Sequence, residues 1–260
     1  MLALPRFIGR ALARYLSTPR PHLQTGTPAD PRKLLQCLQP CDVLLVEGST
    51  RISTAIKYLT QSTWSHAAIF VGAQLGGEDE QGRPYVFVEA DIVKGVCKRP
   101  LAHYAAYHTR ICRARHLADA HRAHIVREVT RQIGNQYDMK NVFDLARYLL
   151  PTPPVPQRWR RRLISLGSGD PTKAICSSLI ADAFQNVGYP VLPLITQTPH
   201  DEHEEAAVKE IFRIRDKSLY APRDFDVSPY FEIVKPTLVR GFDYRQIEWS
   251  PSSYASISNP

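Results

Sequence analysis

No stretch of the sequence approaches the run of about eighteen apolar residues that a membrane-spanning helix needs. No internal repeat is evident either. The first residues do not form a secretory signal, because arginine interrupts every apolar run and no small-residue cleavage site follows. The five cysteines are an odd number without a tight pairing pattern. Together these absences predict a reducing interior, so we expect a cytoplasmic protein rather than a disulfide-stapled secreted one.

Metal-binding patterns are missing as well. Cys37 is followed closely by Cys41, but no second pair of ligands follows at the spacing of a zinc site. His116, His121 and His124 are close together in the sequence, yet no carboxylate or cysteine completes a ligand set at a fixed spacing. Solvated histidines are therefore the simpler interpretation. We expect no metal and no other cofactor.

Acidic residues are absent from positions 1–29, in a chain that carries 33 Lys and Arg against 25 Asp and Glu, a net charge of +8. Within this segment Arg6, Arg10 and Arg14 fall on one helical stripe with apolar residues around them. This pattern predicts a short basic amphipathic helix over residues 2–16. Two interpretations stay open. The helix is either a peripheral anchor that binds anionic lipid at the inner face of a membrane, or a helix packed on the rest of the protein.

A second basic segment follows the proline-rich stretch 151–156, which forbids a helix and predicts an extended chain. Arg160, Arg161 and Arg162 then lead into apolar residues. These arginines form either the solvated face of a packed helix or a second surface for anionic lipid. Nucleic acid is a less suitable partner, because no exposed aromatic residues alternate with these charges and no nucleic-acid-binding motif is present.

Residues 173–188 carry apolar side chains at helical spacing, which predicts a helix with one buried face. Pro171 upstream suits the start of this helix, and Gly188 suits its end. Cys176 would then lie in the first turn, where unpaired backbone amides and the helix dipole favour a thiolate over a thiol. Cys176 is a candidate nucleophile on this basis, and the alternative is a small buried apolar residue.

The best candidate for a base lies far upstream. His66 stands at the start of the apolar run Ala67–Val71, which is typical of a strand buried on both faces. A second β-rich run, Tyr85–Ala90, carries Glu89 near its end, where a carboxylate in an apolar strand needs a partner. A Cys–His pair with a third polar group that orients the imidazole would use all three residues.

Taken in order, these motifs resemble the YiiX/YebB-like proteins. Those proteins are circularly permuted relatives of the NlpC-type, papain-like cysteine hydrolases, with lecithin retinol acyltransferase as a distant relative. The matching pieces are Cys41-Asp42-Val43-Leu44-Leu45, Ser65-His66, Glu89-Ala90, Gly134-Asn135-Gln136-Tyr137-Asp138 and Cys176-Ser177-Ser178-Leu179. The resemblance spans about residues 40–235. It departs from the family at Cys41, where glycine is usual, and at Ser178, where many members have glutamate.

The resemblance implies an α+β fold, a permuted papain-like domain whose antiparallel sheet packs against the cysteine-bearing helix. It also implies that Cys176 forms an acyl-enzyme, that His66 transfers the proton and that Glu89 orients the imidazole. The backbone N–H of Cys176 is the expected oxyanion donor, because the start of the helix leaves it unpaired.

Four further residues, Asp42, Ser65, Tyr137 and Ser177, are expected to line the substrate pocket. For Tyr137 a place in the core is equally open. Three function classes remain at this point. The protein is a hydrolase of peptide-like amides or esters, a lipid-directed acyl hydrolase or acyltransferase, or a non-catalytic binding protein on the same scaffold. The oligomeric state stays open.

The expected organisation is a basic N-terminal segment and linker over residues 1–32, a catalytic domain over 33–240 and a loose tail over 241–260. A basic, proline-rich insertion is expected at 141–172 within the catalytic domain. Two local expectations are tested below. The alternating pattern at 110–114 predicts an exposed strand, and the acidic residues after Thr198 predict a helix that runs to Arg213.

Overall fold

The computed structural model describes residues 15, 17–18, 28–135, 175–199, 208–213, 220–235 and 245. The arginines of the two basic segments, the insertion at 141–172 and Tyr137 lie outside these residues. The same holds for the tail apart from Arg245. The expectations for those parts of the chain therefore remain predictions.

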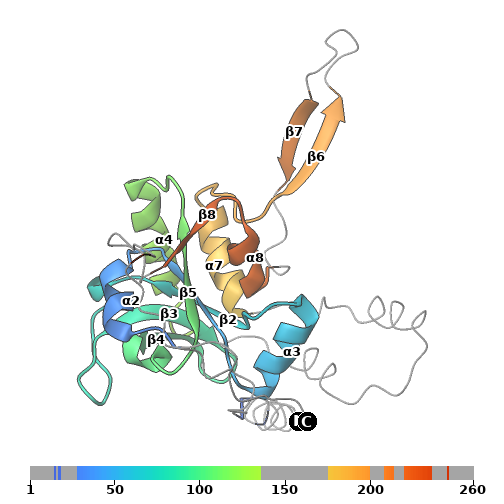
Figure 1. Cartoon of the computed structure of the whole chain (residues 1–260). Helices are drawn as coiled ribbons and strands as arrows, with labels where there is room; N and C mark the ends of the chain where they lie inside the picture. The colour runs from blue at the N-terminus through green and yellow to red at the C-terminus, as the bar shows by residue number, and fades with distance from the viewer. Residues whose placement is uncertain are drawn as a thin grey trace, which may run out of the picture.

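A six-stranded sheet forms the centre of the molecule (Figure 1), and every neighbouring pair of its strands is antiparallel. The strand order is β4-β3-β2-β1-β5-β8. The bounds are β1 Val43–Val46, β2 His66–Phe70, β3 Tyr85–Asp91, β4 Gly95–Pro100, β5 Thr109–Ala114 and β8 Phe231–Val234. The two central strands, β1 and β2, pair in the register Val46↔His66, which places His66 at the end of the sheet beside the last residue of β1.

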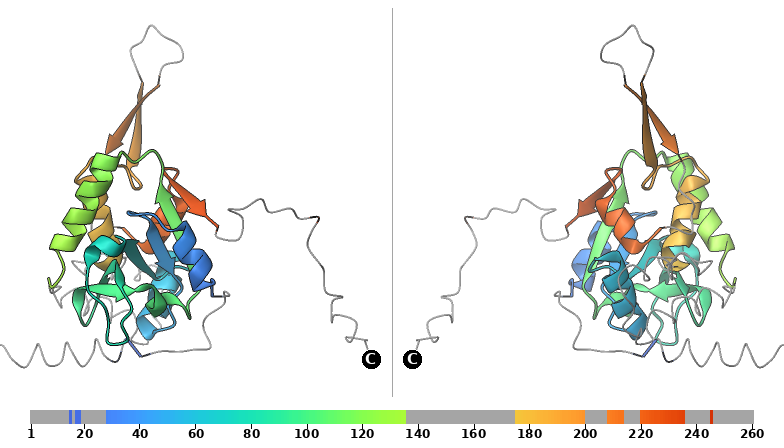
Figure 2. Two further views of the ribbon diagram at one scale, coloured as in Figure 1. Left: turned by 90° about the vertical axis from the view of Figure 1, so that its left-hand side faces the viewer. Right: turned by 90° about the vertical axis from the view of Figure 1, so that its right-hand side faces the viewer.

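Helices cover both faces of this sheet. The helices are α2 Pro31–Cys37, α3 Arg51–Thr60, α4 Asp119–Arg131, α7 Ile175–Gln185 and α8 Pro222–Val227, with short 3-10 helices η2 Ala73–Leu75 and η3 Leu101–Tyr104. Figure 2 shows α4 and α7 side by side on one side of the sheet and α2 on the other. Since both faces are covered, β1 is buried at every position, which explains its unbroken apolar sequence.

The cysteine-bearing helix is the main element on one face. It contacts β2 and β3 directly, and its buried residues Leu179, Ile180 and Phe184 belong to the larger hydrophobic core. A smaller core on the opposite face includes Leu44, whose neighbours on β1 point to the α7 side. The predicted helix, the predicted antiparallel sheet and their packing are confirmed.

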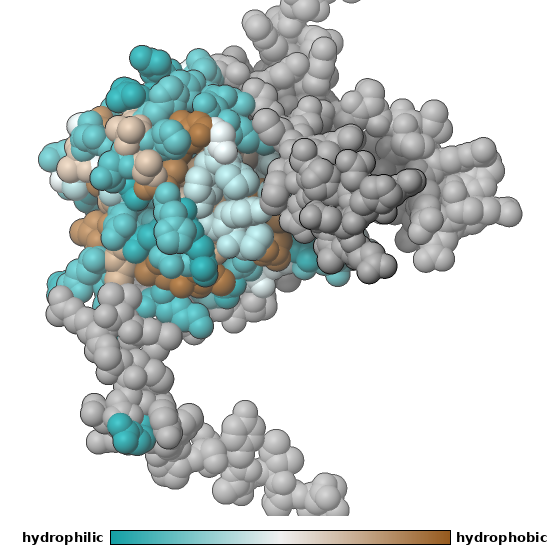
Figure 3. Space-filling view, turned by 90° about the horizontal axis from the view of Figure 1, so that it is seen from above, coloured by the Kyte–Doolittle hydropathy of each residue, from teal (hydrophilic) through white to brown (hydrophobic). Residues whose placement is uncertain are grey.

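On the described part of the surface seen from above, charged and polar side chains cover more area than hydrophobic ones (Figure 3). In the described part of the chain, no helix has the length and hydrophobicity required to cross a bilayer.

Two local expectations were wrong. The strand expected at 110–114 is present as β5, but it is not exposed. It pairs with both β1 and β8, and its residues Ile111 and Cys112 are fully buried. In place of the helix expected from Thr198 to Arg213, the structure has the antiparallel strands β6 Leu194–Pro199 and β7 Val208–Arg213, which project from the body of the protein (Figure 1). The β-branched residues of both segments favour the extended chain here.

The departure from glycine at Cys41 has a structural consequence. Cys41 has a φ of 73°, in the left-handed region that favours glycine, and its amide donates to the carbonyl of Phe70 at 2.8 Å. Its side chain is buried, and its thiol lies 3.3 Å from the carbonyl of Arg122. Cys41 therefore adopts a backbone conformation that glycine adopts more easily, and its side chain is packed in the core.

Candidate active site

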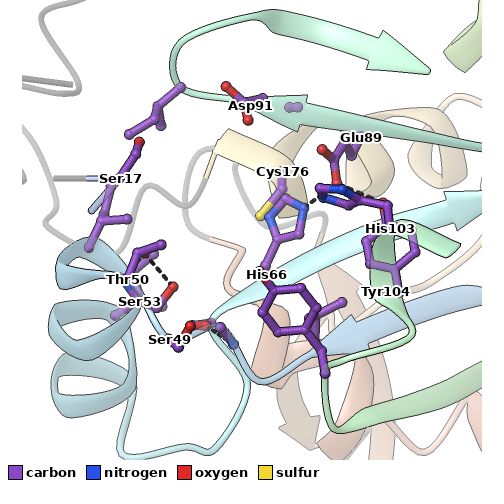
Figure 4. Close-up of a pocket in the computed structure, with 18 residues that line it drawn as sticks. Ser17, Ser49, Thr50, Ser53, His66, Glu89, Asp91, His103, Tyr104 and Cys176 are labelled. Carbon is purple, nitrogen blue, oxygen red and sulfur yellow. Dashed lines mark hydrogen bonds and ion pairs between the residues drawn. The ribbon is translucent and has the colours of Figure 1, made fainter. Parts of the chain in front are cut away.

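Three elements bring the predicted triad together. Cys176 lies in the first turn of α7, His66 opens β2, and Glu89 belongs to β3. Glu89 is paired with Ala68, so His66 is its diagonal neighbour two residues along β2. Figure 4 shows the His66 ring between the sulfur of Cys176 and the Glu89 carboxylate. Residues 110 positions apart in the chain thus meet at one end of the sheet, as the chemistry of the sequence predicted.

The imidazole of His66 is held by a carboxylate. Its Nε2 lies 2.7 Å from Oε2 of Glu89. The side chain of Glu89 is only 2% exposed, whereas that of His66 is 26% exposed. Burial acts to raise the pKa of Glu89, but the charge of His66, its hydrogen bond and the nearby Arg99 hold this pKa well below its usual range. Glu89 is therefore ionised, and Nδ1 is the nitrogen that remains for the cysteine.

The thiol of Cys176 is activated by the same histidine. Burial alone would raise its pKa, but the charge of His66 and a hydrogen bond with the imidazole lower it from the ordinary value. The pKa of His66 is in turn raised, since the effects of Cys176 and Glu89 outweigh that of burial. These opposite shifts describe a thiolate–imidazolium pair.

Three other cysteines behave in the opposite way. Burial raises the pKa of the Cys41 thiol to about 12, that of Cys97 to about 11 and that of Cys112 to about 12. Among these four cysteines, Cys176 alone is shifted towards the reactive thiolate form.

A cavity of about 250 Å³ opens over the triad and is lined by Cys176, His66 and Glu89 (Figure 4). Its remaining wall is mixed. Hydroxyl groups come from Ser49, Thr50, Ser53, Ser65, Tyr104 and Tyr107, and apolar side chains from Val46, Ile52, Ile56, Ala90 and Ile92. The site therefore combines a nucleophile, a proton carrier and an orienting carboxylate with room for part of a substrate.

Comparison with known proteins agrees with this geometry. Residues 37–148 match the model of a family described as permuted papain-like amidase enzymes, YaeF/YiiX, C92 family. The predicted resemblance to this family is confirmed. At the coarse level, the match supports an enzyme of the cysteine-hydrolase type, an amidase. The matched range contains His66 and Glu89 and ends before Cys176.

Among solved structures, the chain is similar to one described as the metalloprotein yiiX from Escherichia coli O157:H7. The sequence identity is 18% and the TM-score 0.42, over 76% of this chain and 96% of that one. No curated protein matches the chain. Among the residues that the structure describes, no group of three or more His, Cys, Asp and Glu side chains could hold a metal ion.

Of the expected pocket residues that the structure describes, only Ser65 lines the cavity. Its Oγ accepts a hydrogen bond from the amide of Gly48 at 2.9 Å. Ser177 is fully buried and does not line the cavity; its Oγ lies 3.9 Å from the sulfur of Cys176, a contact that helps to lower the pKa of that thiol. Tyr137 lies outside the described residues.

Asp42 does not line the cavity, contrary to expectation. It precedes β1 at the end opposite to Val46, which pairs with His66. Its carboxylate is fully buried and accepts two hydrogen bonds from Arg113, at 2.9 and 2.7 Å, and one from the amide of Gln39 at 2.8 Å. Asp42 therefore ties β1 to β5 and has a structural role.

Two residues that contact the triad could not be predicted from the sequence pattern. Arg99 donates from Nε to Oε1 of Glu89 at 2.5 Å, and Tyr104 donates its hydroxyl to Oε2 at 2.7 Å. The signal that could have found Arg99 is the hairpin of β3 and β4, in which Glu89 is paired with Cys97 and Arg99 is two residues further along. Tyr104 comes from η3, directly after β4.

Proposed function

We propose that this protein is a cysteine hydrolase that cleaves an amide or ester bond through an acyl-enzyme on Cys176. The observation that carries the proposal is the position of His66 between Cys176 and Glu89. The imidazole lies 2.7 Å from the carboxylate, and the pKa of the thiol is lowered. An ion pair of this kind keeps the nucleophile as a thiolate near neutral pH. The amidase family of residues 37–148 supports the same reaction class.

The reaction would start with attack of the Cys176 thiolate on the carbonyl carbon of the substrate. The oxyanion of the tetrahedral intermediate would accept a hydrogen bond from the backbone N–H of Cys176, which lies in the first turn of α7 and has no acceptor within the helix. Protonated His66 then gives its proton to the departing amine or alcohol, which leaves a thioester. Water deprotonated by His66 attacks this thioester, and the acid departs as the thiolate returns.

Throughout both steps Glu89 keeps its charge. It holds Nε2 of His66, so that Nδ1 faces the sulfur and the leaving group, and it stabilises the imidazolium form. Glu89 is thus an orienting residue and neither a nucleophile nor a metal ligand.

The acyl-enzyme itself is the test of this proposal. The protein is mixed with a panel of acyl-peptide and ester substrates, quenched in acid within milliseconds to minutes and measured by intact mass. We expect an added mass that equals one acyl group, mapped to Cys176, and its loss in Cys176→Ala. Cys37→Ala, which removes a half-buried thiol on α2, is the matched control and should keep the adduct. An adduct that survives in Cys176→Ala, or its absence for every substrate that is turned over, contradicts the mechanism.

A second candidate is a lipid-directed acyl hydrolase or acyltransferase that works at the inner face of a membrane. The apolar part of the cavity wall favours it, because Ile52, Ile56 and Ile92 would accommodate an acyl chain beside the nucleophile. The basic segments at 2–16 and 160–162 supply positive charge for anionic lipid. In the transferase version an alcohol or amine replaces water in the second step.

The lipid candidate predicts salt-sensitive binding to anionic vesicles. Each arginine near an anionic surface contributes about 1 kcal/mol, so Arg6, Arg10 and Arg14 together contribute about 3 kcal/mol. Replacement of all three by glutamine should therefore weaken co-sedimentation with phosphatidylserine vesicles at low salt by about 100-fold. This triple variant is preferable to removal of residues 1–20, because Thr18 accepts a hydrogen bond from the amide of Arg51.

The matched control for the vesicle experiment removes the same charge elsewhere, at the exposed residues Arg83, Arg115 and Arg127. This control should bind like the wild type. If both triple variants lose the same affinity, the attraction depends on net charge alone. If the wild type does not bind at low salt, the N-terminal anchor is wrong.

A further inference from the structure

We infer that Arg99 and Tyr104 are positioning residues for the reaction, which fix the Glu89 carboxylate so that it holds His66. The inference rests on the proposed cysteine-hydrolase function and extends the site by a second layer. Arg99 also separates Glu89 from a second carboxylate, that of Asp91, which lines the same cavity. These three roles can be tested apart from the triad itself.

Both oxygens of Glu89 are engaged. Oε2 accepts from His66 and from the Tyr104 hydroxyl, each at 2.7 Å, and Oε1 accepts from Arg99 at 2.5 Å. A glutamate has three side-chain torsions, one more than an aspartate, so an unheld carboxylate would sample several orientations. The donors on the far side of Glu89 leave it one position, in which Oε2 faces the imidazole.

Tyr104 suits this role because it is rigid and keeps its proton. Its side chain is 2% exposed, and its ring packs edge-to-face on Phe87 with 5.0 Å between the centroids. Burial and the neighbouring Glu89 raise the pKa of Tyr104 well above its ordinary value. The hydroxyl therefore remains a donor over the whole pH range in which the thiolate works.

Arg99 has an electrostatic role as well. Glu89 and Asp91 are two residues apart on β3 and share one face of the sheet. The guanidinium of Arg99 bridges them, with Nε on Glu89 at 2.5 Å and a terminal nitrogen on Asp91 at 3.2 Å. Without a cation between them, the two carboxylates repel each other. That repulsion would displace the Glu89 carboxylate from the position in which it holds His66.

Other groups near Glu89 do not replace this cation. The titratable side chains around it are His66 on β2, Cys97 and Arg99 on β4, His103 and Tyr104 on η3, Asp91 on β3 and Cys176 on α7. His66 is already paired with the thiolate. Burial lowers the pKa of His103, which favours its neutral form. Among the described residues, Arg99 is thus the cation that contacts Glu89 and takes no part in proton transfer.

The test is the pH dependence of Cys176 alkylation by iodoacetamide, mapped by mass spectrometry. Arg99→Met should react about tenfold more slowly at pH 6, because Oε1 of Glu89 loses a charge-assisted hydrogen bond and the carboxylate then holds His66 less firmly. The rate at high pH, where the thiol is ionised in any case, should be unchanged. Arg99→Lys keeps the charge and should lose less. Asp91→Asn combined with Arg99→Met should regain most of the rate at pH 6, since Glu89 then no longer faces a second carboxylate whose charge is not neutralised.

Arg83→Met is the matched control, because Arg83 also pairs with a carboxylate, that of Asp79, but in an exposed loop. It should leave the profile unchanged. If Arg99→Met does not fold, Tyr104→Phe and Arg99→Lys carry the test, and we expect each to slow alkylation at pH 6 by about threefold. Wild-type profiles in folded Arg99 and Tyr104 variants overturn the inference, and so does an Arg99→Met defect that Asp91→Asn does not relieve. If the wild type itself does not alkylate first at Cys176, the proposed function fails instead.

Discussion

Replacing His66 by glutamine is expected to slow the alkylation of Cys176 by iodoacetamide at pH 6 by about 100-fold or more. The thiol is buried, and it is the charge of His66 that brings its pKa below the ordinary value. Without that charge only the effect of burial remains, which raises the pKa. An ordinary thiol with a pKa of about 8.5 is only about 0.3% ionised at pH 6, and a buried one is ionised less.

The shape of the pH profile follows from the direction of the two shifts. The pKa of Cys176 is lowered and that of His66 is raised, so the thiolate–imidazolium pair exists in the window between them. The wild-type rate should be flat inside this window and should fall as the pH drops below the lowered thiol pKa. In His66→Gln the flat region disappears, and the rate should rise with pH until the buried thiol ionises in alkali.

His108→Gln is the matched control for this experiment. His108 also contacts a buried glutamate, with Nδ1 3.2 Å from Oε2 of Glu47, but neither residue lines the cavity over Cys176. Its variant should alkylate with the wild-type profile. Equal profiles for His66→Gln and the wild type would remove His66 from the site. Faster labelling of Cys37 than of Cys176 in the folded wild type would remove the cysteine.

Local patterns were sufficient to predict much of this fold. The boundaries of β1 and α3 follow from an apolar run and from a helix whose start is capped by Thr50, which accepts a hydrogen bond from the amide of Ser53 at 3.2 Å. Such signals depend on residues that are neighbours in the chain. The β6–β7 hairpin was missed because an acidic turn was interpreted as the start of a helix, while the pairing that decides the structure joins residues such as Leu194 and Arg213.

The burial of β5 was missed for a related reason. Arg110 and Arg113 were interpreted as the side of a strand that faces water, although residues three apart lie on opposite faces of a strand. In the structure both arginines are partly covered, because Arg110 pairs with Asp226 at 2.6 Å and Arg113 with Asp42. The partners lie 116 and 71 residues away, so the sequence pattern alone could not reveal them.

The candidate site divides in the same way. Cys176, His66 and Glu89 could be predicted because each is chemically out of place in its element: a thiol at a helix start, an imidazole at the mouth of a buried strand and a carboxylate in an apolar strand. Arg99 and Tyr104 are ordinary in their own segments and become informative only once the β3–β4 register places them on Glu89. Asp42 is the opposite case. The motif predicted a place in the pocket, but its contact with Arg113 shows a structural role.

The second large effect concerns stability and follows from that partner. Asp42→Ala is expected to lower the free energy of unfolding by about 3–5 kcal/mol, because it leaves Arg113 without its carboxylate partner and the amide of Gln39 without its acceptor. Arg113→Met should cost a similar amount, since it strands a carboxylate that is fully buried. Asp119→Ala is the control, because Asp119 pairs with Arg122 at 3.7 Å from a fully exposed position and should cost less than about 1 kcal/mol.

The double variant Asp42→Ala with Arg113→Met should be more stable than either single variant. Burial raises the pKa of Asp42 in spite of its hydrogen bonds with Arg113, so the pair does not fully offset the cost of removing the carboxylate from water. Removing both charges ends that cost, whereas removing one leaves the other uncompensated. Urea unfolding of the four proteins at neutral pH gives the coupling energy directly. Additive losses would show that the two side chains stabilise the sheet independently, which would contradict the conclusion that their ion pair ties β1 to β5.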